Sequence, residues 1–260
     1  MKKRVRQSVG VFRMEATSAK TAEILIYEQI GYSWWDDSGV ESKDFVEKLA
    51  ALGDVDEITV RINSPGGDVF EGVAIYNALK THNAKINVQI DSLAASIASV
   101  IAMAGDTITI SDSAMIMIHN ASGFCMGEAA DMRKMADVLD KIRDAQLLGA
   151  YARTGKTPEE LTSMMDAETW FTAKEAVDAG FADSIMVAGS KADPQARMKF
   201  DLSGFRNAPT QVESSNISIE KQSEIAPKAP ENGGISAENQ QKALIAAQAR
   251  NRNLRLAELS

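Results

Sequence analysis

The sequence predicts an α/β fold built from repeated βαβ units around a mainly parallel sheet. Short β-branched runs alternate with segments of helical apolar spacing over residues 22–187, an alternation typical of parallel sheets covered by helices. Strong turn signals separate these segments, for example Asn63-Ser64-Pro65-Gly66-Gly67. With 260 residues and 45% hydrophobic content, the chain can bury one sizeable core.

The expected elements are assigned from apolar spacing and from start and stop signals. Ser42 precedes Phe45, Leu49 and Leu52 at helical spacing, and Pro158 stands where a helix tolerates proline best. The expected strands are 22–30, 58–62, 86–90, 107–110 and 114–118, with a turn and a last strand over 180–185. The expected helices are 42–52, 69–80, 92–103, 128–153, the one that Pro158 begins, and 174–178. We expect the first three helices to cover a face of the sheet.

The composition changes along the chain and indicates four segments. No aromatic residue follows Phe205, and Ser, Asn, Gln, Glu and Pro dominate residues 207–236, as in disordered linkers. Leu244, Leu254 and Leu259 give the end of the chain only a thin apolar stripe. We therefore expect a flexible segment at 1–20, a globular domain at 21–187, a disordered linker at 188–236 and a C-terminal helix within 237–260.

Charge and composition exclude several classes of partner. The net charge of -8 gives no basic face, so we expect no nucleic acid. The single cysteine, Cys125, excludes an intrachain disulfide and fits a reducing compartment, where it is expected as a structural or exposed thiol. No apolar stretch of signal-peptide length follows the basic start, and the most apolar window, 93–104, is too short to span a membrane. The sequence predicts a soluble, cytoplasmic protein.

The chain has two histidines that could activate a nucleophile. His82 lies in a polar loop and is expected at the surface. His119 ends the apolar run 114–118, and the carboxyl ends of strands are where active sites of α/β sheets lie. The alternative for His119 is a residue at the edge of the core with a backbone partner.

A serine and a glycine pair complete the candidate site. Ser96 follows a strand and opens a helix, whose N-terminus favours a developing anion, although serine and alanine at helix starts also serve packing. Ser92 is expected as the N-cap of that helix. Gly66 and Gly67 can present N–H groups to an oxyanion, or form no more than a tight turn.

Taken together, these motifs resemble the Clp protease proteolytic subunit family over residues 22–187. The matching pieces are Ile62-Asn63-Ser64-Pro65-Gly66-Gly67, Ala94-Ala95-Ser96-Ile97-Ala98, Met117-Ile118-His119-Asn120 and Phe171-Thr172-Ala173-Lys174-Glu175-Ala176 with Gly180-Phe181-Ala182-Asp183. The resemblance implies a ClpP/crotonase-like fold and a serine endopeptidase that needs no cofactor or metal. It implies Ser96 as nucleophile, His119 as base, and an oxyanion hole from the N–H of Ile97 and of Gly66 or Gly67.

The acidic member of the triad departs from the resemblance. The family would place an aspartate two residues before Phe171, where this chain has Thr169. Asp166 is preferred as the replacement and Glu168 is the alternative. Both carboxylates can also be solvated charges at a helix end.

The Trp34-Trp35-Asp36 loop and the polar C-terminal extension resemble the bacteriophage and prophage branch of the family. Its members resemble head maturation proteases, which cleave scaffold and capsid proteins. This implies a polypeptide substrate, a location in the host cytoplasm or prohead, and a tail, 190–260, that is scaffold-like or self-cleaved. The family also implies a homo-oligomer of stacked rings, commonly heptameric, in which the helix at 128–153 pairs the rings.

Three alternatives stay open from the sequence. The first is a housekeeping Clp peptidase that works with an ATPase unfoldase. The second is a crotonase-type acyl-CoA hydratase or isomerase, which uses a similar glycine turn as an oxyanion hole and binds CoA. The third is a ring-forming scaffold without activity.

Overall fold

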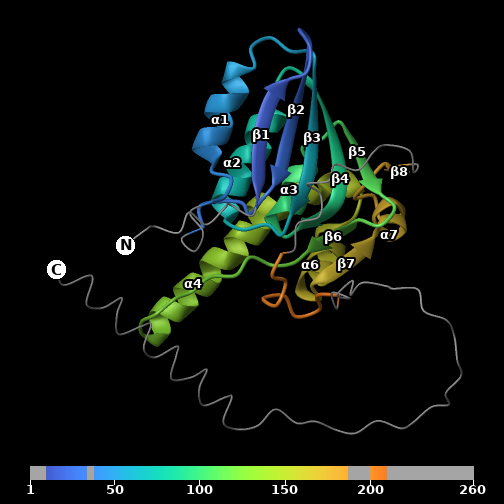
Figure 1. Ribbon diagram of the computed structural model, residues 1–260. Coiled ribbons are helices and arrows are strands. Elements are labelled where there is room, and N and C mark those ends of the chain that lie inside the picture. The colour runs from blue at the N-terminus through green and yellow to red at the C-terminus, as the bar shows by residue number, and fades with distance from the viewer. Residues whose placement is uncertain (1–9, 34–37, 187–199, 210–260) are drawn as a thin grey trace, which may run out of the picture. The chain divides into compact units, whose positions relative to one another are not determined.

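The computed structural model describes residues 10–33, 38–186 and 200–209, which form a mixed α/β fold (Figure 1). Its strands are β1 (Val11–Ala16), β2 (Thr21–Tyr27), β3 (Glu57–Ser64), β4 (Lys85–Ala95), β5 (Thr107–Ser111), β6 (Met115–Ile118), β7 (Thr169–Thr172) and β8 (Ser184–Met186). Its helices are α1 (Ser42–Ala51), α2 (Val69–Lys80), α3 (Ile97–Ala102), α4 (Ala129–Ile142), the π-helical η1 (Arg143–Leu147), α5 (Leu148–Tyr151), the 3-10 turn η2 (Ala152–Thr154), α6 (Pro158–Asp166) and α7 (Ala173–Asp178). The predicted α/β class is confirmed.

The strands form one sheet in the order β1-β2-β3-β4-β5-β8, and the successive pairs from β2 to β8 are parallel. Strand β1 is antiparallel to β2 at one edge. On the edge opposite β3, the long strand β4 has two successive partners: β5 along Asn87–Ile90 and β6 along Leu93–Ala95. Strand β7 adds to β6 in the antiparallel direction. The second half of β4 and its partner β6 therefore branch away from the main sheet.

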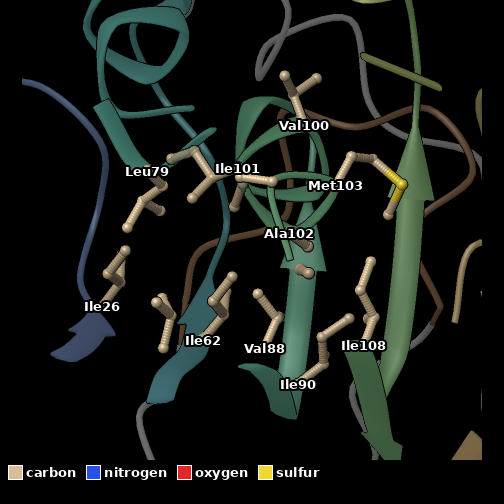
Figure 2. Packing of buried hydrophobic residues seen from close by; sticks show 14 of the residues in the cluster. Ile26, Ile62, Leu79, Val88, Ile90, Val100, Ile101, Ala102, Met103 and Ile108 are labelled. Carbon is tan, nitrogen blue, oxygen red and sulfur yellow. The ribbon is translucent and has the colours of Figure 1, made fainter. Parts of the chain in front are cut away.

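The hydrophobic core lies between the sheet and the helices that cover it. Figure 2 shows side chains of the central strands, such as Ile62 and Ile90, facing Leu79 of α2 and Ile101 of α3. These four side chains are fully buried. Burying a side chain of this size contributes about 1.5–3 kcal/mol, so the packing of α2 and α3 fixes both helices on the sheet.

Strand β1 occupies residues that the sequence analysis assigned to a flexible start. Phe12 and Met14 alternate with more exposed residues and pack on the core, as expected for an edge strand. The ring of Phe12 stacks on Phe45 of α1, with centroids 5.8 Å apart. The expected flexible segment therefore cannot extend to residue 20. The loop at 34–37 lies outside the described residues.

The expected helix at 92–103 is wrong at its start. Residues 92–95 continue β4, and α3 begins only at Ile97, so Ser92 is not an N-cap. The reason is tertiary, because Leu93 to Ala95 pair with Met115 to Met117 of β6 and this pairing outweighs the local helical pattern.

The later helices follow the expected boundaries with one change of form. The helix expected at 128–153 occurs as α4, η1, α5 and η2 in succession. Thr157 caps α6 by accepting from the N–H of Glu160, and Pro158 takes the first helical position. Within the described residues, no helix is long and apolar enough to cross a membrane. The expected C-terminal helix lies outside the part of the chain that is described.

Candidate active site

Ser96 sits at a sharp turn between β4 and α3. Its backbone has φ 54 and ψ -129, a conformation that costs a residue with a side chain about 1–3 kcal/mol. Its N–H donates to the carbonyl of Met117 at 3.0 Å, which ties the turn to β6. A strained strand-to-helix turn of this kind exposes a serine hydroxyl, as in nucleophile elbows.

The glycine turn after β3 lies directly against Ser96. A Cβ at Gly66 would lie 2.7 Å from both the Ser96 Cβ and the Ala95 carbonyl oxygen, and 3.1 Å from the Ile97 nitrogen. Gly66 also has φ +90, which glycine adopts without strain. Only glycine therefore lets the turn approach the serine this closely.

His119 follows the last residue of β6 and faces Ser96. Its Nε2 lies 2.7 Å from the Ser96 Oγ, a distance at which the hydroxyl donates to the neutral ring. The β4–β6 pairing places them, since Ala95 is opposite Met117 in the register. Burial lowers the pKa of His119 and Arg206 acts in the same direction, while the carboxylate of Glu168 opposes them. The imidazole is therefore neutral near pH 7 and can accept a proton.

The backbone offers N–H donors beside the serine. The N–H of Ile97 is the first of α3 and has no acceptor within that helix. The N–H of Gly66 donates to Ser64 Oγ at 3.2 Å, and Gly66 and Gly67 both line the cleft beside Ser96. A cleft of about 300 Å³ lies over these groups. It is lined by Gln29, Pro65, Gly66, Gly67, Val69, Ser96, His119, Ala121, Ser122, Asp201, Gly204 and Phe205.

The two candidate acids lie in different surroundings. Asp166 is exposed and accepts from Asn120 Nδ2 at 2.6 Å, and no hydrogen bond joins it to His119 within the described chain. Glu168 is 4% exposed and its charge acts on His119. Thr169, at the position where the family resemblance would place an aspartate, donates to the carbonyl of Met164 at 2.7 Å. Glu168 is not hydrogen-bonded to His119 within the described residues either, but its burial and the effect of its charge on His119 make Glu168, which the sequence analysis gave as the alternative, the preferred acid.

Backbone amides hold the carboxylate of Glu168. Oε1 accepts from the N–H of Asn207 at 2.6 Å and from Trp170 Nε1 at 3.4 Å, and Oε2 accepts from the N–H of Arg206 at 3.0 Å. Burial alone would raise the pKa of Glu168. The amides of Asn207 and Arg206, together with Trp170 and the neighbouring His119, outweigh it and lower the pKa. Glu168 is therefore an anion held in a fixed place.

Residues 200–209 lie in the expected linker, yet they contact the site. Phe205 meets the His119 ring edge-on, with centroids 5.4 Å apart, and Asp201 and Gly204 line the cleft with it. The signals in the sequence were that Phe205 is the last aromatic of the chain and that Phe200 and Leu202 stand before it among polar residues.

The other residues that the sequence singled out have local partners. His82 Nδ1 accepts from the N–H of Ala84 at 3.0 Å, which closes its loop. Cys125 is partly exposed, and its thiol donates to the carbonyl of Asp131 at 3.7 Å. Within the described residues, no three His, Cys, Asp or Glu side chains gather in a way that could hold a metal ion.

A serine hydroxyl bonded to a neutral imidazole, beside backbone N–H groups of a helix start and a glycine turn, is a site of the type that carries out nucleophilic acyl transfer. The Clp protease family matches residues 19–189, and the chain belongs to that family. It is 30% identical over 178 residues to ATP-dependent Clp protease proteolytic subunit 2 of Thermobifida fusca (strain YX), covering 66% of this chain and 88% of that protein. It is 34% identical over 140 residues to ATP-dependent Clp protease proteolytic subunit 1 of Leifsonia xyli subsp. xyli (strain CTCB07), covering 53% and 71%.

Proposed function

We propose that this protein is a serine endopeptidase with Ser96 as nucleophile and His119 as general base. The 2.7 Å contact between His119 Nε2 and Ser96 Oγ is the observation that carries the proposal. It favours peptide hydrolysis over the acyl-CoA hydratase alternative, because a hydroxyl and an imidazole face the glycine turn where a hydratase needs its own acid and base.

Each step of the reaction has a group in place. His119 takes the proton of Ser96 Oγ as that oxygen attacks the peptide carbonyl, and the oxyanion forms beside the N–H groups of Ile97 and of Gly66 or Gly67. His119 then protonates the leaving amine, which departs and leaves an acyl ester on Ser96. A water molecule, deprotonated by His119, hydrolyses the ester. Glu168 assists by stabilising the imidazolium through its charge.

The proposed physiological role is cleavage of scaffold or capsid proteins in phage prohead maturation, by a homo-oligomer of stacked rings. The polar extension after the peptidase domain and the Trp34-Trp35-Asp36 loop support this role. A second role is favoured by the relatives, which are described as ATP-dependent Clp protease proteolytic subunits: a housekeeping peptidase fed by an ATPase unfoldase. Pull-down with the host unfoldase separates the two roles, since only the housekeeping peptidase retains it.

Covalent labelling by a fluorophosphonate probe tests the activity. We expect labelling at Ser96, its loss in Ser96→Ala, and a rate about 10²- to 10⁴-fold lower in His119→Ala, the range that a general base contributes. His82→Ala is the matched control and should label at the wild-type rate. Labelling that persists in Ser96→Ala would refute Ser96 as the nucleophile.

A further inference from the structure

The segment 200–207 lies beyond the 19–189 match to the Clp protease family, yet it covers the catalytic residues. Figure 1 shows it in orange beside β6 and β7. Phe200, Leu202 and Phe205 pack on a small apolar cluster of the branched sheet, formed by Leu93, Ala95 and Met117 with Met115 and Trp170. This segment thus belongs to the packing of β4, β6 and β7.

The segment is anchored by hydrogen bonds to the turn that carries Glu168. The backbone N–H groups of Arg206 and Asn207 donate to its carboxylate. Their side chains bind the same turn, with Arg206 Nη2 3.0 Å from the carbonyl of Asp166 and Asn207 Nδ2 2.8 Å from that of Ala167. Glu168 has φ 49, a strained conformation for a residue with a side chain, so these bonds hold a turn that is unfavourable by itself.

Phe205 is fixed between two rings. Its ring is edge-on to His119 at 82° and edge-on to Trp170 at 78°, with centroids 5.4 and 5.8 Å apart. The same imidazole contacts Ser96 Oγ through its Nε2. Phe205 therefore restricts the tilt of the ring whose nitrogen must meet the serine.

We propose that residues 200–207 complete the catalytic site, with Phe205 positioning the His119 imidazole and the amides of Arg206 and Asn207 positioning the Glu168 carboxylate. This rests on the proposed peptidase function. A segment outside the family match then takes part in the reaction, and the functional domain ends at residue 207 instead of residue 187.

If Phe205 sets the environment of the His119 ring, its removal changes the pKa of His119. Within the described residues, Glu168 and Arg206 act on His119 through their charges, and Asp201 lines the same cleft. Truncating Phe205 leaves these charges in the chain and removes part of the apolar cover of the imidazole. Because burial is what holds the pKa of His119 down, the pKa should rise in Phe205→Ala.

The experiment uses the full chain and two measurements. The first is a pH titration of the histidine ring signals by NMR, with His82→Gln identifying the signal of His119. The second is the rate of fluorophosphonate labelling. We expect Phe205→Ala to raise the His119 midpoint and to slow labelling about three- to tenfold, the size of an aromatic contact. Phe205→Tyr, which keeps the ring, should restore both.

A second pair of variants tests the amides. Asn207→Pro removes the N–H that Glu168 accepts, whereas Asn207→Ala keeps that N–H and removes only the side-chain bond to Ala167. We expect Asn207→Pro to label about tenfold more slowly than Asn207→Ala, as for a hydrogen bond to a charged group. Equal rates for the two would overturn the role of the amide.

The remaining outcomes are decisive in the same way. Faster labelling in Phe205→Ala would mean that the segment obstructs the cleft. An unchanged midpoint of the His119 pH titration would mean that Phe205 does not set the environment of the ring. Either result overturns the proposal. If Phe205→Ala does not fold, Phe205→Leu keeps the apolar volume without the ring and should give a smaller upward shift. A wild-type protein that labels at no pH refutes the peptidase function alone, since the His119 titration still decides the contact.

Discussion

Replacing Gly66 with alanine tests the geometry of the site at its tightest point. The new Cβ would lie 2.7 Å from the Ala95 carbonyl oxygen and from the Ser96 Cβ, and neither group can rotate away. The backbone would also hold a residue with a side chain at φ +90, which costs about 1–2 kcal/mol. Relief of the contact requires Ser96 to move, and a displacement near 1 Å at a reacting group costs about 10²-fold in rate.

We therefore expect Gly66→Ala to lower the free energy of unfolding by about 1–3 kcal/mol and the labelling rate of Ser96 by about 10²-fold. Gly53→Ala is the matched control, because Gly53 has φ +72 but no atom within 4 Å of an added Cβ. It should lose stability through backbone strain alone and label normally. Thermal unfolding and labelling kinetics measure the two effects. The reasoning is refuted if Gly66→Ala labels like the wild type, or if both variants lose labelling equally.

Three further predictions concern groups around the serine. Glu168→Gln should slow labelling about tenfold, because an amide NH₂ would replace one carboxylate oxygen that accepts from the backbone N–H groups. Asp166→Asn should change the labelling rate less than twofold. A larger loss in Asp166→Asn than in Glu168→Gln would make Asp166 the acid. Labelling should persist below pH 6.5, because burial lowers the pKa of His119 and the imidazole stays neutral at that pH. A loss of labelling with its midpoint above pH 6.5 would contradict the lowered pKa. Tyr151→Phe should lower the free energy of unfolding in urea by about 1 kcal/mol, because the Ser99 Oγ loses its 2.8 Å hydrogen bond to the Tyr151 hydroxyl. Labelling should change little, because Ser99 Oγ keeps its bond to the Ser96 carbonyl. An unchanged urea midpoint would show that the buried bond does not contribute to stability.

The sequence was informative wherever the structure depends on neighbours along the chain. The β-branched runs predicted the parallel strands, and the resemblance to the Clp protease family implied the pairing of Ser96 with His119, whose Oγ and Nε2 lie 2.7 Å apart. Their catalytic roles remain predictions. Where the outcome depends on strand pairing, as at residues 92–95, the local helical pattern was misleading.

The acid could not be chosen from the sequence for a similar reason. Asp166 and Glu168 are two residues apart on one turn, and local spacing treats them alike. Only the carboxylate of Glu168 accepts from the backbone N–H groups of Arg206 and Asn207, some forty residues later, in a stretch whose composition resembles a linker. The hydrogen bonds to Glu168 come from backbone N–H groups, which every residue except proline has, so the sequence does not show which residues provide them.

The double pairing of β4 has a consequence for how this protein can change. The spacing of Ser96 and His119 is set by backbone hydrogen bonds between β4 and β6, because Ser96 lies one residue past Ala95 and His119 two residues past its partner Met117, and not by the loops that follow. Loop residues such as Ala121 and Ser122 line the cleft without carrying that spacing. Insertions and substitutions there can alter which peptides are accepted while the reacting pair stays in register, so selectivity and chemical competence can evolve independently.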